Sequence, residues 1–187
     1  MNSPQVTSKK LILVTGPARS GKSEWAENLA ISSHKQVIYI ATSQVDSNDL
    51  EWQTRIEQHQ NRRPRDWTTL EIPVELSETL TTYAHEDCCI LVDSLGTWLA
   101  NILSQDETAW NETLEVLIEA LLKASGDVIL VGEETGWGIV PSFPIGRLFR
   151  DRLGHLIRRV GVISQSVYLV TGGHVLNLSV LGTPLNI

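Results

Sequence analysis

The eight residues 16–23 constrain the fold of this chain more than any other part of its sequence. They fit the pattern Gly-x-x-x-x-Gly-Lys-Ser, between an apolar β-branched run at 11–14 and a segment with helical spacing from Ser23. Glycines let such a loop curl so that backbone N–H groups point at phosphate oxygens, and the helix dipole adds positive charge. The strand, loop and helix together predict a phosphate-binding loop (P-loop).

The residue types in and near this loop predict how a nucleotide is held. Lys22 would bring a positive charge to the outer phosphates, and the Ser23 hydroxyl is placed to ligate Mg²⁺. Asp93 ends a second apolar run, 89–92, so its carboxylate would face the same Mg²⁺ at the carboxyl edge of a sheet. The sequence therefore predicts a P-loop nucleotide-binding protein with Lys22 as a catalytic residue and Ser23 and Asp93 as metal ligands. The candidate loop contacts are Gly16, Pro17, Ala18, Arg19, Ser20, Gly21, Lys22 and Ser23.

Apolar β-branched runs alternate with helical patterns along the whole chain. We expect strands at 11–14, 37–41, 89–93, 127–131 and 167–170, and helices at 23–33, 49–60, 75–83, around 98–103, 109–123 and 145–163. Such alternation is typical of an α/β fold with a mostly parallel central sheet flanked by helices. Residues 1–9 lack periodicity and predict a flexible tail, and 10–187 predict a single nucleotide-binding and catalytic domain.

Composition excludes several function classes. The 187 residues include 22 acidic and 15 basic side chains, a formal net charge of −7, so a nucleic-acid-binding surface is not expected. No run of 18 apolar residues and no apolar leader is present, which predicts a cytoplasmic protein without a membrane span. The two cysteines, Cys88 and Cys89, are adjacent in an apolar run and suit neither a disulfide framework nor a metal knuckle.

His59 stands out among the five histidines because arginines surround it. Arg55 shares its helix face four residues earlier, and Arg62, Arg63 and Arg65 follow within six residues. The cluster is either a solvated basic face or a phosphate site. In a phosphate site, arginine forks bind the oxygens and a neutral imidazole attacks phosphorus. The remaining histidines are expected to be surface or structural residues. Of the six tryptophans, only Trp137, between two glycines, is a candidate ligand contact.

Several motifs occur in the order in which one known family has them. They are the segments 14–23 and 39–43, Arg55-Ile56-x-x-His59 with Arg63-Pro64-x-x-Trp67, 91–93, Gly136-x-Gly138-Ile139-Val140-Pro141, and 149–151. From about residue 11 to 170 the chain resembles the adenosylcobinamide kinase / adenosylcobinamide-phosphate guanylyltransferase family, bifunctional enzymes of cobalamin biosynthesis.

The resemblance implies a fold, an assembly and two reactions. The fold would be a RecA-type P-loop fold and the assembly a homotrimer. The enzyme would phosphorylate adenosylcobinamide with ATP or GTP. A histidine would then attack the α-phosphate of GTP, release pyrophosphate and pass GMP to adenosylcobinamide phosphate, giving adenosylcobinamide-GDP. The attacking histidine falls on His59. The nucleotide contacts fall on the P-loop and on Thr42, Ser43, Gln44, Asn61, Arg62, Arg63, Pro64, Glu71 and Asp93.

Three departures from the family pattern concern the acceptor side. Glu133-Glu134 stands for an Asn-Glu pair, Ser142-Phe143 for Glu-Asn, and Ile157-Arg158 for Asn-Gln. They keep two alternatives open. One is a P-loop kinase for cobinamide or another small alcohol without guanylyl transfer, and the other is a nucleotide-switched binding protein. Glu134 and Asp93 are the candidates for the kinase's general base.

Overall fold

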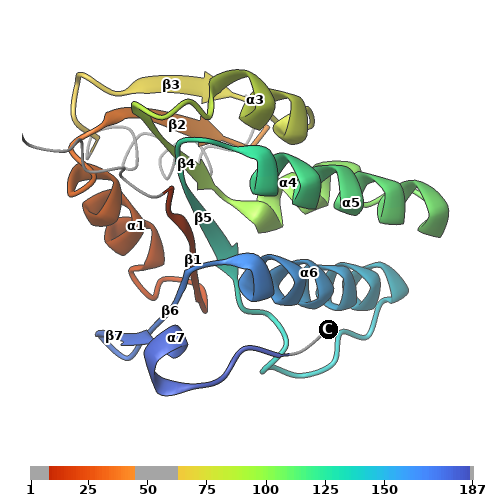
Figure 1. Ribbon diagram of the computed structural model, residues 1–187. Coiled ribbons are helices and arrows are strands. Elements are labelled where there is room, and N and C mark those ends of the chain that lie inside the picture. The colour runs from red at the N-terminus through yellow and green to blue at the C-terminus, as the bar shows by residue number, and fades with distance from the viewer. Residues whose placement is uncertain (1–8, 45–62, 186–187) are drawn as a thin grey trace, which may run out of the picture.

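A seven-stranded sheet forms the centre of the computed structural model, which describes residues 9–44 and 63–185 (Figure 1). The strand order is β3-β2-β4-β5-β1-β6-β7, and every pairing is parallel except that of β6 with β7. The strands are β1 Leu11–Gly16, β2 Gln36–Ala41, β3 Thr68–Glu71, β4 Cys88–Asp93, β5 Asp127–Glu133, β6 Ser166–Thr171 and β7 His174–Asn177. The α/β class with a mostly parallel sheet, predicted from the sequence, is confirmed.

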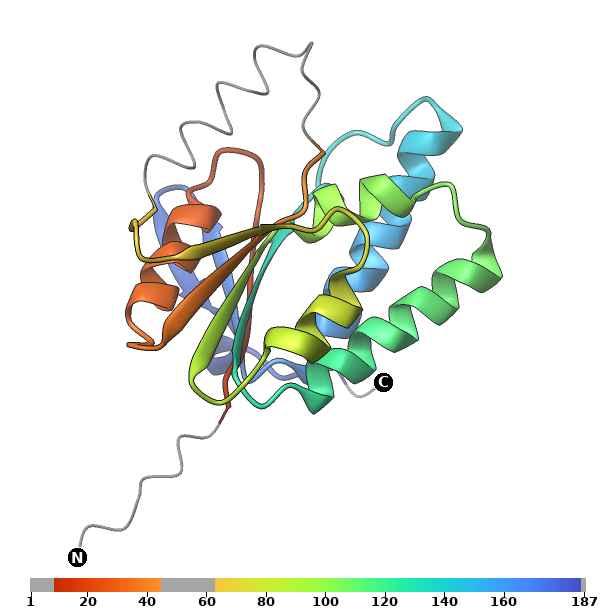
Figure 2. The same cartoon turned by 90° about the horizontal axis from the view of Figure 1, so that it is seen from above.

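Helices cover both faces of this sheet, as Figures 1 and 2 show. Helix α1 packs on one face, and α3, α4, α5 and α6 pack on the other. The helices are α1 Lys22–Ile31, α3 Leu76–Tyr83, α4 Leu95–Ile102, α5 Glu107–Lys123, α6 Pro144–Ile163 and the short α7 Leu178–Leu181. Because each central strand is buried on both faces, its sequence is a continuous apolar run rather than an alternating one.

The strand β1 shows how this burial is divided. Leu11 and Leu13 belong to the core under α3–α6, whereas Ile12 and Val14 belong to the core under α1. Successive side chains of a strand point to opposite faces, so one apolar run supplies both cores. In the sheet β5 lies between β1 and β4.

Three short elements were not expected from the sequence. The edge strand β3 is largely exposed, so it lacks the apolar run that marks the central strands. Strand β7 returns from β6 through Gly172 and Gly173, whose φ angles are 57° and 74°. A Gly-Gly pair between two strands is a signal for a two-residue hairpin, so the sequence did contain a sign of β7. The third is the short helix α7, which follows β7 directly.

Two predictions on the chain's organisation are not tested by the fold. The expected helix at 49–60 lies outside the described residues. The division into a tail 1–9 and a domain 10–187 stays a prediction.

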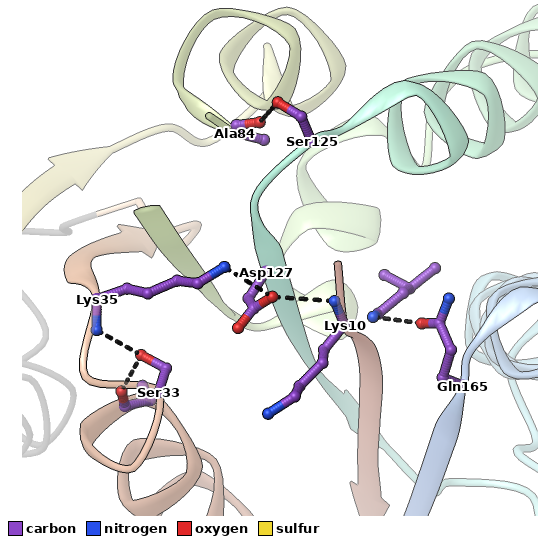
Figure 3. A network of polar contacts seen from close by, with 9 residues as sticks. Lys10, Ser33, Lys35, Ala84, Ser125, Asp127 and Gln165 are labelled. Atoms are coloured by element: carbon purple, nitrogen blue, oxygen red, sulfur yellow. Dashed lines mark hydrogen bonds and ion pairs between the residues drawn. The ribbon is translucent and has the colours of Figure 1, made fainter. Parts of the chain in front are cut away.

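A polar network joins the amino ends of β1 and β5, at the edge of the sheet opposite the P-loop (Figure 3). Asp127 is 4% exposed. Its Oδ1 accepts a hydrogen bond from the Lys10 N–H at 2.9 Å and lies 3.1 Å from the Lys35 Nζ. Nearby, the side chain of Gln165 accepts the Leu11 N–H. These contacts satisfy backbone groups at the start of β1, where the parallel ladder begins.

Removal of the Asp127 carboxylate is expected to destabilise the fold. Asp127→Ala leaves the partly buried Lys10 N–H and the largely buried Lys35 ammonium without their acceptor, so the free energy of unfolding should fall by about 3 kcal/mol. Urea denaturation followed by circular dichroism measures the change. The control is Lys123→Ala, which breaks a pair with Glu119 whose side chains are 76% and 66% exposed and should cost less than about 1 kcal/mol. An Asp127→Ala loss no larger than that of the control would contradict the assignment.

Candidate functional site

The P-loop lies at the carboxyl end of β1 and connects it to α1, as the sequence predicted. Gly16 packs so closely on the backbone that a Cβ there would overlap the carbonyl oxygen of Val170. Gly21 has a φ of 90° at the start of α1, in the left-handed region that favours glycine. Both glycines of the motif are therefore required by backbone geometry, and together they curl residues 16–22 around the helix amino terminus.

The polar side chains of the loop are arranged to receive an anion. Lys22, the first residue of α1, is 7% exposed, and its Nζ lies 3.4 Å from the carbonyl oxygen of Pro17. Its ammonium is thus folded back over the loop. The buried Oγ of Ser20 has no hydrogen-bond partner among the described residues. A buried hydroxyl without a partner in a phosphate-binding motif is a donor that a phosphate oxygen can satisfy.

Asp93 ends β4 at the same edge of the sheet, and Tyr39 orients it. The Tyr39 hydroxyl donates to Oδ2 of Asp93 at 2.9 Å. Burial, and then the Asp93 charge, raise the pKa of Tyr39 far above its usual range, so the phenol stays protonated and donates at all physiological pH values. The hydrogen bond fixes the orientation of the Asp93 side chain, whose oxygens are the kind of ligand that a divalent cation prefers.

Arg63 and Trp67, from the Arg63-Pro64-x-x-Trp67 motif, pack on the Tyr39 ring. The Arg63 guanidinium lies 3.4 Å from the centroid of the Tyr39 ring, and the Trp67 ring stacks on Tyr39 with a centroid distance of 6.4 Å. Arg63 and Pro64 also line a cavity of about 440 Å³ together with Glu71, the last residue of β3. Three of the residues predicted as nucleotide contacts therefore meet at the edge strand β3, and β2 lies between this strand and the Asp93 strand.

Thr42 follows β2 and is fully buried. Its hydroxyl donates to the Ser94 carbonyl oxygen at 2.7 Å and accepts the Ser94 N–H at 2.9 Å, and it also contacts Thr97. Asn101 donates to the Thr42 carbonyl oxygen at 2.8 Å. This network joins the end of β2 to α4. The Thr42 hydroxyl is therefore already hydrogen-bonded within the protein. The neighbouring Ser43 is partly exposed and Gln44 exposed.

The structure does not test the histidine half of the site. His59, Asn61 and Arg62 lie outside the described residues, and so does Arg55. The other histidines have the expected surface positions: His34, His85 and His174 are exposed, and His155 is partly exposed on α6. Trp137 is 66% exposed in the loop after β5, whereas Trp98 and Trp110 are buried in the core.

Glu133 is the residue that sequence reasoning did not place in the site. It ends β5, next to the P-loop strand, and its Oε2 accepts the Gly96 N–H at 2.9 Å in the first turn of α4. Burial raises the pKa of this carboxyl, and a hydrogen bond from Ser94 and the charge of Lys22 act against that shift. Its position at the end of a central strand was the available signal. It now joins Asp93 and Glu134 as a candidate base.

Glu134 contacts the P-loop through its backbone and the following loop through its side chain. Its N–H donates to the Gly16 carbonyl oxygen at 2.9 Å, and its Oε1 accepts the Gly136 N–H at 2.6 Å. The residue thus ties the P-loop to the loop 134–143. Arg147 of α6 donates to the carbonyl oxygens of Pro141 and Ser142 at 2.9 and 2.7 Å, so the loop is held from both ends.

Comparison with known proteins decides the family. A sequence model of the family described as cobinamide kinase / cobinamide phosphate guanyltransferase matches residues 12–178. The chain belongs to this family. It is 40% identical to a bifunctional adenosylcobalamin biosynthesis protein of Pseudomonas aeruginosa over 92% of this chain and 98% of that protein. It is 37% identical to one of Salmonella typhimurium, over 87% of this chain and 96% of that protein. The family predicted from the sequence is confirmed, and with it the enzyme class that the family's description names.

Solved structures resemble the chain in fold. A protein of Pyrococcus horikoshii OT3 matches with a TM-score of 0.55 at 10% identity, over 91% of this chain and 86% of that one. This similarity supports the α/β architecture alone. Within the described residues no helix is long and apolar enough to cross a bilayer.

Tyr39→Phe is expected to weaken the site without disturbing its packing. The variant keeps the ring that Arg63 and Trp67 cover but removes the donor to the Asp93 carboxylate, so the free energy of unfolding should fall by about 1.5 kcal/mol. Urea denaturation measures the loss. Tyr39→Leu, which also removes the ring contacts, should cost clearly more. Equal stabilities of Tyr39→Phe and the parent protein would show that the hydroxyl does not hold Asp93.

Glu133→Gln is expected to change how stability depends on pH. A carboxyl whose pKa is raised on folding binds its proton more tightly when folded, so stability declines as the pH rises from the unfolded pKa, about 4.3, through the folded one. The amide introduced by the substitution would keep an acceptor for the Gly96 N–H but cannot ionise. The variant should therefore be more stable than the parent at pH 8, with a smaller difference at pH 4.

Denaturation at both pH values, with Glu119→Gln on the exposed face of α5 as control, measures this difference. A Glu133→Gln difference that is the same at pH 4 and pH 8 would contradict the assignment.

Proposed function

We propose that this protein performs both reactions of its family on the pathway to adenosylcobalamin: it phosphorylates adenosylcobinamide and then transfers GMP to the product. The observation that carries this proposal is the convergence of the P-loop, Lys22 and Asp93 at one edge of the sheet, in a chain of this family. Its relatives are named bifunctional adenosylcobalamin biosynthesis proteins and match over nearly their whole length.

In the first reaction the P-loop holds ATP or GTP. The acceptor hydroxyl attacks the γ-phosphorus, the nucleoside diphosphate leaves, and a carboxylate of the site takes the hydroxyl proton. Asp93, Glu133 and Glu134 are the candidates for that base. Lys22 and the loop N–H groups neutralise the charge that develops on the transferred group.

Mg²⁺ suits the residues present. Among the described residues no group of three histidine, cysteine or acidic side chains is placed to hold a metal by itself. Mg²⁺ is bound through one or two protein oxygens together with substrate phosphates and water, so the Ser23 hydroxyl and the Tyr39-oriented Asp93 are sufficient donors. When bound with the nucleotide, the ion would supply positive charge that offsets the charge of the phosphates.

In the second reaction His59 is the proposed nucleophile. An imidazole nitrogen attacks the α-phosphorus of GTP, and the bond to pyrophosphate breaks as the N–P bond forms. A phosphate oxygen of adenosylcobinamide phosphate then attacks the same phosphorus and releases the imidazole. The packing of Arg63 on Tyr39 supports this proposal, because it holds the residue four positions after His59 against the ring whose hydroxyl bonds Asp93. We also propose that the protein forms a homotrimer and is located in the cytoplasm.

Covalent labelling tests the two halves separately. Incubation with GTP labelled at the α-phosphate should leave acid-labile, base-stable label on the protein, and His59→Ala should abolish the label while retaining phosphorylation of adenosylcobinamide. Lys22→Ala should slow both reactions about 100-fold or more, because both use the same phosphate cradle. His85→Ala, at an exposed position away from the site, is the matched control.

Each other result selects a different function. Phosphorylation without any label identifies a kinase alone, and nucleotide binding without turnover identifies a switched binding protein. Undiminished label on His59→Ala would assign the nucleophile to another residue.

A further inference from the structure

An apolar groove runs along α6 on the side that faces the carboxyl-terminal segment. Its volume is about 340 Å³, within the range of small-molecule sites. Leu13 of β1, Ile157 and Gly161 of α6, Leu169 of β6 and Leu185 form much of its wall. None of the residues predicted as nucleotide contacts lines it.

One buried polar atom in this groove has no partner among the described residues. Thr15 lines the groove and is 7% exposed, and its Oγ1 makes no hydrogen bond within the described part of the chain. Buried hydroxyls in folded proteins are nearly always hydrogen-bonded, because an unpaired one loses its contact with water without compensation. An unpaired threonine hydroxyl in the wall of a groove indicates a ligand that supplies the missing hydrogen-bond partner.

Two residues at one end of the groove adjoin the P-loop. Thr15 immediately precedes Gly16, the first residue of the P-loop. Glu134, which also lines the groove, donates its N–H to the Gly16 carbonyl oxygen at 2.9 Å. Trp137 and Arg158 line the groove as well and offer a ligand there an aromatic ring and a guanidinium. A molecule in the groove therefore has one end beside the nucleotide phosphates.

We propose that this groove binds the acceptor of the transfer reactions, with the reacting hydroxyl at the Thr15–Glu134 end; this assignment rests on the proposed function. Cobinamide carries its hydroxyl on a short amide-linked arm, and its periphery combines methyl groups with carboxamides. The apolar wall suits the methyl groups, the Thr15 hydroxyl suits an amide, and the Glu134 carboxylate accepts an N–H or O–H. The groove is smaller than the whole acceptor, so it takes the arm and the adjoining side chains.

Gly161 offers a way to fill the groove without disturbing the fold. A Cβ at Gly161 would lie 3.6 Å from Cδ2 of Leu13 and 4.0 Å from Cγ2 of Val167, which is ordinary van der Waals contact with two groove residues. Gly161→Ala is thus accommodated, whereas the longer side chain of Gly161→Met extends into the groove. Gly161→Met should weaken adenosylcobinamide binding about tenfold or more, and Gly161→Ala should stay within about twofold.

Thr15→Val tests the unpaired hydroxyl. The two side chains have nearly the same shape, so the variant should be at least as stable as the parent without acceptor, yet bind adenosylcobinamide about fivefold more weakly. A hydroxyl with a purely structural role would give the opposite result, a less stable protein with unchanged affinity.

Equilibrium dialysis with adenosylcobinamide measures acceptor affinity. GTP affinity is measured separately without acceptor, and Val116→Met on the exposed face of α5 serves as the matched control. If the parent protein binds and phosphorylates adenosylcobinamide and Gly161→Met binds it equally well, the groove assignment is wrong and the proposed function stands. If the parent neither binds nor phosphorylates it, both fail. A change in the sedimentation coefficient of Gly161→Met would instead identify the groove as a contact between copies of the chain, which overturns the assignment.

Discussion

The parallel alignment of β1, β4 and β5 is the constraint on which the rest of this structure depends. Parallel strands place their carboxyl ends at one edge, so the P-loop after β1, Asp93 at the end of β4 and Glu133 at the end of β5 become neighbours, although they are far apart along the chain. Apolar burial on both faces stabilises this alignment. The polar network around Asp127 satisfies the backbone at the opposite edge.

Tyr39 links two parts of the proposed chemistry through one buried ring. Its hydroxyl orients the carboxylate that is proposed to face the metal, and its face carries the guanidinium of Arg63. A displacement of the segment near Arg63 would therefore reach Asp93 through a single side chain.

The proposed acceptor side is built differently from the proposed nucleotide side. The P-loop presents backbone groups and charge, which suit any triphosphate. The groove along α6 presents apolar walls and the Thr15 hydroxyl, which is unpaired among the described residues, and these features suit a ligand of matching shape. Glu134 adjoins both the P-loop and the groove. Its N–H donates to the Gly16 carbonyl oxygen, and its side chain accepts the Gly136 N–H in the adjoining loop. Of the positions where the chain departs from the family pattern, Ile157 and Arg158 line this groove.

The sequence by itself determined the α/β class, the position of the P-loop, the family and the central strands, because each of these depends on a local pattern: an apolar run, two glycines at fixed spacing, a lysine at a helix start. It predicted His59 as nucleophile through the arginines around it and through a resemblance, and the described structure leaves that prediction open. Tertiary structure alone decided that the Thr42 hydroxyl bonds the start of α4 and that the Tyr39 hydroxyl bonds Asp93. It also decided that Glu133 is buried near the Lys22 charge and that the Thr15 hydroxyl is buried without a partner among the described residues. These outcomes depend on which strands are neighbours and on which side chains meet across them, and no local pattern carries that information.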